Sequence, residues 1–148
     1  MRWITLIAAV LMVASAAEAQ TQITRDPVQI ELCLCLERAI STRGAEMERR
    51  KSAFERLQAQ IAAQRQATDR DRDQVDSTNE AAVNAFRIRV ETIQEQEDEL
   101  WQTYQPALVE AIAVYTERTE MFGRECIGRQ FDRDVMQRVR ARMQCVID

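Results

Sequence analysis

Apolar residues recur every three or four positions along the first half of the chain, which is the spacing of a helix with one buried side. Asp26 before Pro27 supplies an N-cap acceptor and a residue suited to the first helical turn. We therefore predict a helix over about residues 27–68. Written as heptads, its stripe places Cys33, Ile40, Met47, Phe54 and Ile61 at position a, and Leu36, Arg43, Arg50, Leu57 and Gln64 at position d.

A second helix is predicted over about residues 77–122, after a tip at about 69–76. Residues 69–73 alternate in charge without apolar content, and Ser77 and Glu80 have the spacing of a capping box. Pro106 lacks a backbone N–H and should kink this helix. Its stripe places Val83, Val90, Glu97, Tyr104 and Ala111 at position a, and Phe86, Ile93, Leu100, Ala107 and Val114 at position d.

The two stripes match when the helices fold back on each other. In an antiparallel pair an a residue faces a d residue, and one register then sets Phe54 against Ile93. The same register sets Arg50 opposite Glu97, the two charged residues that interrupt the seam. We interpret them as an ion pair that specifies the register, because a slipped alignment would leave either charge buried alone. The alternative is a charged patch that grips a ligand between the helices.

A short third helix is predicted over about residues 132–147, with Asp132 as its cap and Phe131 and Met136 as a hydrophobic staple. We expect it to cover a second stripe of the preceding helix, which consists of Trp101, Leu108, Tyr115 and Phe122 at seven-residue spacing. Its exposed Arg133, Arg138, Arg140 and Arg142 would then face the acidic residues of that helix. A basic surface for anionic partners is the competing interpretation of these arginines.

Four cysteines lie near the two ends of the helical region: Cys33, Cys35, Cys126 and Cys145. Residues two apart on a helix point in nearly opposite directions, so Cys33 and Cys35 should each bond to a distant partner. We favour Cys33–Cys126 with Cys35–Cys145, although counting from the tip places Cys126 roughly 10 Å too far from Cys33. A four-thiolate zinc site and a redox-active dithiol are the two alternatives.

The first nineteen residues have the features of a cleaved signal peptide. One basic residue precedes a short apolar run, and Ala17-Glu18-Ala19 before Gln20 fits a small-x-small cleavage site. The apolar run is shorter than the roughly 20 residues that span a bilayer, so we expect cleavage rather than a retained anchor. Gln20 is not a cysteine, which disfavours lipid attachment. The expected location is therefore periplasmic or secreted, with no integral membrane segment after cleavage.

Composition excludes several classes of function. The chain of 148 residues has 3 glycines, 2 prolines and few aromatic residues, which favours extended helices over strands. Its formal charge of −4 mixes both signs, so we expect no nucleic-acid partner. There is no histidine, which removes the usual proton shuttle and the commonest metal ligand. We expect no catalytic residues, no metal site and no cofactor.

The sequence therefore predicts one all-α domain over residues 20–148. It is a long antiparallel coiled-coil helical hairpin with a short third C-terminal helix packed at its base, braced by disulfides. The expected function is that of an exported structural or protein-interaction module of a bacterial-type cell envelope, and homo-oligomers are compatible with it. One alternative is a periplasmic chaperone or inhibitor that grips a client through Trp101, Tyr104, Leu108 and Tyr115. The other is a thiol-dependent metal or redox protein.

Overall fold

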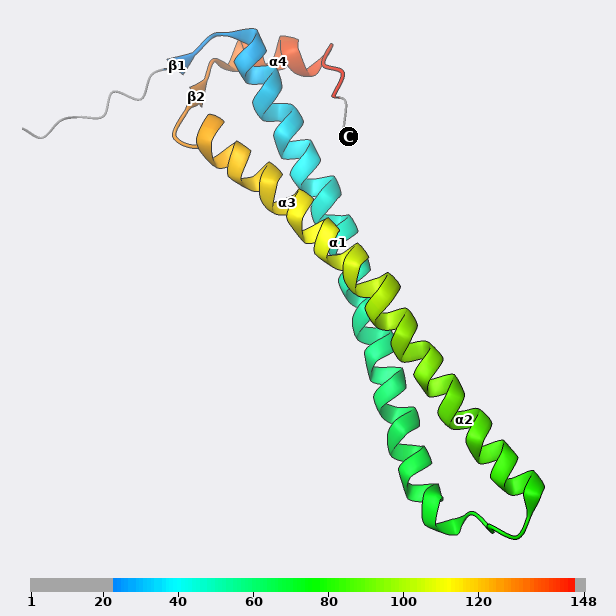
Figure 1. The fold of residues 1–148 in the computed structure, drawn as a ribbon. Coiled ribbons are helices and arrows are strands. Elements are labelled where there is room, and N and C mark those ends of the chain that lie inside the picture. The colour runs from blue at the N-terminus through cyan, green and yellow to red at the C-terminus, as the bar shows by residue number, and fades with distance from the viewer. Residues whose placement is uncertain (1–22, 146–148) are drawn as a thin grey trace, which may run out of the picture.

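The protein is an all-α antiparallel hairpin closed at one end by disulfides, as Figure 1 shows. The computed structural model describes residues 23–145, so the predicted signal peptide lies outside the described residues. Helix α1 (Pro27–Asp71) forms one arm. The other arm consists of α2 (Glu80–Glu99), the π-helical turn η2 (Leu100–Tyr104) and α3 (Gln105–Glu125). The short α4 (Arg133–Arg140) packs at the base, where α1 begins and α3 ends.

The start of α1 agrees with the sequence prediction. The carboxylate of Asp26 accepts a hydrogen bond from the backbone N–H of Val28 at 3.0 Å, and Pro27 occupies the first turn. This cap satisfies one of the N–H groups that a helix start leaves unpaired. With 45 residues, α1 is roughly 68 Å long, so it supplies one arm of the hairpin without interruption.

The tip differs from the prediction. Helix α1 continues to Asp71 and the 3₁₀ turn η1 (Arg72–Gln74) follows it, while α2 begins only at Glu80. The predicted capping box of Ser77 and Glu80 is wrong: Asn79 is the cap and accepts from the N–H of Ala82 at 3.2 Å. Asp76 accepts from both the N–H and the hydroxyl of Thr78, which holds residues 76–78 in a turn before the helix.

Pro106 changes the second arm in the region predicted, through a π-helical turn. The backbone N–H of Gln105 donates to the carbonyl of Leu100, five residues earlier. A proline within a helix clashes with the carbonyl four residues before it, and a wider turn relieves that clash. The arm therefore continues through η2 into α3, and Trp101 lies within the widened turn.

Helix α4 packs on α1, which corrects the prediction that it would cover the second arm. Its Val139 is almost fully buried against Ile30 and Leu34 of α1, with Phe131 and Val135 at the edge. The carboxylate of Asp132 caps α4, as predicted, by accepting from the N–H groups of Asp134 and Val135. The apolar face of α4 is thus used up on α1, and its arginines do not meet the acidic residues of α2 and α3.

Helix α4 is also shorter than the predicted 132–147, because it ends at Arg140. The following residues leave the helix, and Cys145 bonds to Cys35 with a Cα–Cα distance of 5.3 Å. A small parallel strand pair joins β1 (Ile23–Thr24) to β2 (Gln130–Phe131), although no strands were expected. It ties the segment before α1 to the segment before α4, with the N–H of Asp132 donating to the carbonyl of Thr24 at 3.0 Å.

The favoured disulfide pairing is confirmed. Cys33 bonds to Cys126 with a Cα–Cα distance of 5.7 Å, and all four cysteines are in disulfides. Both sulfurs of this first bond are buried, beside Leu36. The distance estimate from the tip placed Val114 rather than Cys126 next to Cys33, so the actual register differs from the predicted one by about three helical turns at the base.

The predicted ion pair of Arg50 with Glu97 is wrong. Arg50 donates to Glu46 of its own helix at 2.7 Å and lines a shallow depression with Ala107. Glu97 instead pairs with Arg65 across the seam. The register differs from the predicted one for two reasons. The centre of the tip lies later in the chain than expected, and the arms separate toward the tip (Figure 1). Residues at equal distances along the chain from the tip therefore do not lie opposite each other.

The core of the hairpin is thin. Among the described residues, only ten apolar side chains are buried. All but Ala39 fall into three clusters, one between α1 and α4 at the base, a second around Cys33–Cys126 and a third around Ile61, Ile93 and Leu100. Slender folds bury little apolar surface for each ordered residue, so they depend on cross-links. Between residues 23 and 145, no helix combines the length and the apolar character needed to cross a bilayer.

Reduction of the disulfides should lower the melting temperature strongly. By chain entropy, whichever disulfide closes the large loop first stabilises the fold by roughly 4–5 kcal/mol. The other disulfide contributes less, because the ends of the chain are then already held together. Replacing Cys33 and Cys126 by alanine should cost more stability than replacing Cys35 and Cys145, since both cysteines of the first pair are buried and those of the second are partly exposed. Thermal unfolding followed by circular dichroism measures both; equal transitions with and without reductant would contradict the prediction.

A double-mutant cycle tests the register. The cycle of Arg65→Ala with Glu97→Ala should show a coupling of about 0.2–1 kcal/mol, the range of solvent-exposed ion pairs. The matched cycle of Arg50→Ala with Glu97→Ala should show none, because Arg50 pairs with Glu46. Urea unfolding of the six proteins gives both values. Coupling in the second cycle alone would restore the register in which Arg50 faces Glu97.

Candidate functional site

An exposed apolar surface runs along one side of the second arm, and we call it the apolar flank. It consists of Trp101, Leu108, Val109, Ile112 and Tyr115. Trp101 is 52% exposed, Val109 58% and Ile112 44%, while Leu108 and Tyr115 are half-buried. Such a series of large apolar side chains, spread over about four helical turns, is a feature of surfaces that bind another protein.

Three of the four residues predicted to bind a partner are at least partly exposed along the second arm. Trp101 lies in the π-helical turn, and Leu108 and Tyr115 lie seven residues apart on α3. Tyr104 differs, because it packs in the seam with Ile93 and Leu100. Val109 and Ile112 were not predicted. Their signal was present in the sequence, since Ile112 lies four residues after Leu108 and on the same face.

The indole of Trp101 is held by an aromatic contact across the seam. Its ring meets the ring of Phe54 edge to face, with centroids 6.0 Å apart and planes at 70°. This is a favoured geometry for aromatic pairs. Phe54 is itself half-buried on the cluster of Ile61 and Leu100, so one edge of the indole is fixed while about half of the residue faces solvent. The exposed part is therefore positioned before any partner arrives.

Tyr115 is placed by a glycine on the opposite arm. A Cβ atom at Gly44 would lie 3.3 Å from Cε2 of the Tyr115 ring, so the ring packs directly on the backbone of α1. Gly44 is the only glycine of α1, and a glycine within a helix costs about 1 kcal/mol relative to alanine. The close approach gives that glycine a packing role, and it brings the two arms together beneath the apolar flank.

A shallow depression between α1 and α3 combines charged and apolar side chains. Its charged residues are Arg43, Glu46, Arg50 and Glu110, and its apolar residues are Ala107, Ala111 and Val114. Hydrogen bonds from the side chains of Arg50 and Arg49 lower the pKa of the Glu46 carboxyl, which stays ionised at neutral pH. This depression is where the predicted charged patch would lie, but its charges compensate each other and Glu97 is not among its residues.

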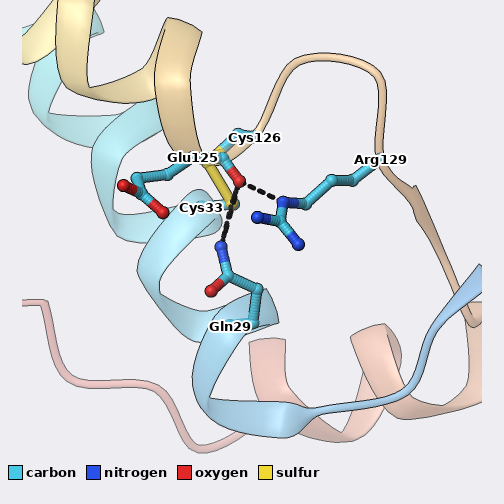
Figure 2. The surroundings of a disulfide bond; sticks show 5 residues. All are labelled: Gln29, Cys33, Glu125, Cys126 and Arg129. Carbon is cyan, nitrogen blue, oxygen red and sulfur yellow. Dashed lines mark hydrogen bonds between the residues drawn. A yellow bond between two sulfur atoms is a disulfide. The ribbon is translucent and has the colours of Figure 1, made fainter.

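The base is locked around the Cys33–Cys126 bond, as Figure 2 shows. The carbonyl of Glu125, at the end of α3, accepts from the side-chain amide of Gln29 at 3.0 Å and from Arg129. These contacts satisfy a terminal carbonyl of the helix. Because both disulfides are formed, no cysteine thiolate is present, and the structured part of the chain contains no cluster of three acidic, cysteine or histidine side chains suited to a metal ion.

Comparisons with protein-family models, with curated proteins and with solved structures each found no match to this chain. Its function therefore has to be argued from the site itself. The apolar flank is the surface with the clearest chemical character, since it combines exposed aromatic and branched side chains on a cross-linked support.

Substitution of Gly44 tests the contact with Tyr115. Alanine favours a helix over glycine by about 1 kcal/mol, so Gly44→Ala would stabilise the fold by that amount if nothing opposed it. The half-buried Tyr115 ring must move by a few tenths of an ångström to make room, so the measured gain should be smaller. Gly44→Val should destabilise, since its branched side chain displaces the ring. Gly123→Ala is the control, because nothing lies within 4 Å of the added atom. Urea unfolding measures all three, and a stabilising Gly44→Val would contradict the contact.

Proposed function

We propose that this protein is an exported interaction module of a bacterial-type cell envelope, which binds a protein partner through the apolar flank. The observation that carries the proposal is the exposed series of Trp101, Val109 and Ile112 on a support that is cross-linked at its base. A prepositioned aromatic anchor is typical of the residues that dominate binding energy at protein interfaces. Preorganisation also reduces the entropy lost on binding.

Export is supported by cysteine chemistry together with the signal-like start of the chain. All four cysteines are in disulfides, and such bonds persist in the periplasm and outside the cell but are rare in the cytosol. The small-x-small site before Gln20 supplies the matching targeting feature. An oxidising compartment would maintain the cross-links on which the slender fold depends.

Binding rather than catalysis is supported by the residue types present. The chain has no histidine, and most of its described carboxylates lie on solvated helix faces rather than in a cleft. A role as a periplasmic chaperone or inhibitor uses the same surface but loses Tyr104, which packs in the seam. A thiol-dependent metal or redox role would require a reduced form of the protein, because both disulfides are formed.

Site-specific photocrosslinking tests the proposal. A photoreactive residue replacing Ile112 should capture a protein partner in cells that express the full chain, whereas one replacing Glu117 of the same helix should not. Trp101→Ser should reduce the product at position 112 by roughly tenfold or more, the loss expected for an aromatic anchor. Equal products at both positions, or a yield that Trp101→Ser leaves unchanged, would contradict the proposal. Circular dichroism of each variant checks that the hairpin is intact.

A further inference from the structure

The base of the hairpin has a positive net charge, whereas the arms have a negative one. Residues 23–38 and 123–145, which form the base, contain eight basic and six acidic residues. Residues 39–122, which form the arms and the tip, contain eleven basic and sixteen acidic residues. A molecule whose charge is separated along its long axis is oriented by an anionic surface, with the base toward that surface.

Helix α4 is the most basic part of the base. Between residues 133 and 142 the chain carries a single acidic residue, Asp134. Four arginines of this segment are exposed and form no ion pair within the described residues: Arg133, Arg138, Arg140 and Arg142. Because Val135 and Val139 pack on α1, the outer surface of α4 consists largely of guanidinium groups.

Two carboxylates at the base are already engaged within the chain. Asp26 caps α1 by accepting from the backbone N–H of Val28. Asp132 caps α4 and also pairs with Arg25 at 3.1 Å. These two carboxylates therefore leave the charge of the α4 arginines available to an anionic partner.

Exposed apolar side chains accompany this charge. Val28 in the first turn of α1 is 73% exposed, and Ile127 in the turn after α3 is 71% exposed. They are the two most exposed large apolar side chains among the described residues, and the exposed Ile23 of β1 lies at the same end of the molecule. Arginines beside exposed branched side chains suit the interface of an anionic bilayer. An acidic protein or a nucleic acid would account only for the arginines.

The predicted signal peptide leads into the same end of the molecule. Ala19, its last residue, is four residues before Ile23, so the chain between them spans at most about 14 Å. Strand β1 begins at Ile23 and pairs with β2, which directly precedes α4 (Figure 1). Before cleavage, a signal peptide in the membrane would therefore hold the base at the lipid surface.

We propose that the base binds an anionic lipid surface peripherally, with the α4 arginines against the headgroup phosphates and Val28 and Ile127 at the edge of the acyl chains. Guanidinium groups suit phosphate oxygens because they donate two parallel hydrogen bonds. The negatively charged arms then extend away from the membrane, and the apolar flank stays free for a protein partner. The base and the flank are separate surfaces, so this inference goes beyond the proposed function.

Vesicle binding tests the inference. The oxidised protein beginning at Gln20 should co-sediment with vesicles of phosphatidylglycerol and phosphatidylcholine in equal amounts, and at least about tenfold more weakly with phosphatidylcholine alone. Arg138→Gln with Arg140→Gln should weaken binding to the anionic vesicles roughly tenfold, and added salt should weaken it as well. Ile127→Ser should weaken it severalfold, because less apolar surface is then buried in the bilayer.

The matched control is Lys51→Gln with Arg56→Gln. Both side chains are exposed on α1 and form no ion pair in the described part of the chain, so this variant has the same net charge as the α4 variant. It should bind anionic vesicles as the native protein does, and circular dichroism checks that every variant is helical. Equal losses in the two variants would overturn the inference, because net charge rather than the base would then decide binding.

Tryptophan fluorescence reports the orientation on the vesicle. Trp101 is the only tryptophan after Gln20, and it precedes Cys126 by twenty-five residues, roughly 38 Å along the arm. Anionic vesicles that also contain brominated phosphatidylcholine should therefore leave its emission unquenched. In a protein with Trp101→Phe and Ile127→Trp, the same vesicles should quench the emission.

A protein that does not bind anionic vesicles would overturn the inference, whether or not it binds DNA or polyglutamate. Quenching of Trp101 would overturn it too, because the hairpin would then contact the membrane through the apolar flank, and so would an unquenched tryptophan at position 127. Failure of the proposed function has its own signature, which is crosslinking equal at positions 112 and 117.

Discussion

The bond between Cys33 and Cys126 is the constraint on which the rest of the structure depends. It fixes which residue of the second arm lies opposite which residue of α1, and every contact across the seam follows from that choice. Gly44 then meets Tyr115, and Arg65 meets Glu97. A seam with few buried side chains and several polar ones specifies its register weakly. A covalent link at one end therefore fixes the register more firmly than the packing alone would.

The π-helical turn connects this constraint to the candidate site. Pro106 prevents an ordinary helical turn before it, and the wider turn that results contains Trp101. The indole then lies beside Phe54 at the edge of the seam, half buried and half exposed. The wider turn that Pro106 requires therefore contains Trp101, the largest side chain of the apolar flank. The contact with Phe54 of α1 holds the indole in place without covering it.

Hydrophobic burial decides where helix α4 docks. Its apolar face packs on Ile30 and Leu34 of α1, so charge pairing does not determine its position. The α4 arginines remain exposed at the base, without an ion-pair partner in the part of the chain that the structure describes.

The sequence by itself determined the helices, their caps at Asp26 and Asp132, and that Cys33 and Cys35 bond to distant partners, because helix periodicity, capping and the opposed directions of Cys33 and Cys35 are local properties. It did not determine the register, and it paired Arg50 with Glu97, because counting from the tip assumes arms that stay parallel and a tip of known centre. Only the tertiary structure decided that Glu46 pairs with Arg50, that Tyr104 packs in the seam while Ile112 is exposed, and that α4 covers α1. These outcomes depend on the separation of the arms, on the π-helical turn and on competition among several apolar faces. Each of these is a property of the whole fold and cannot be read from one segment.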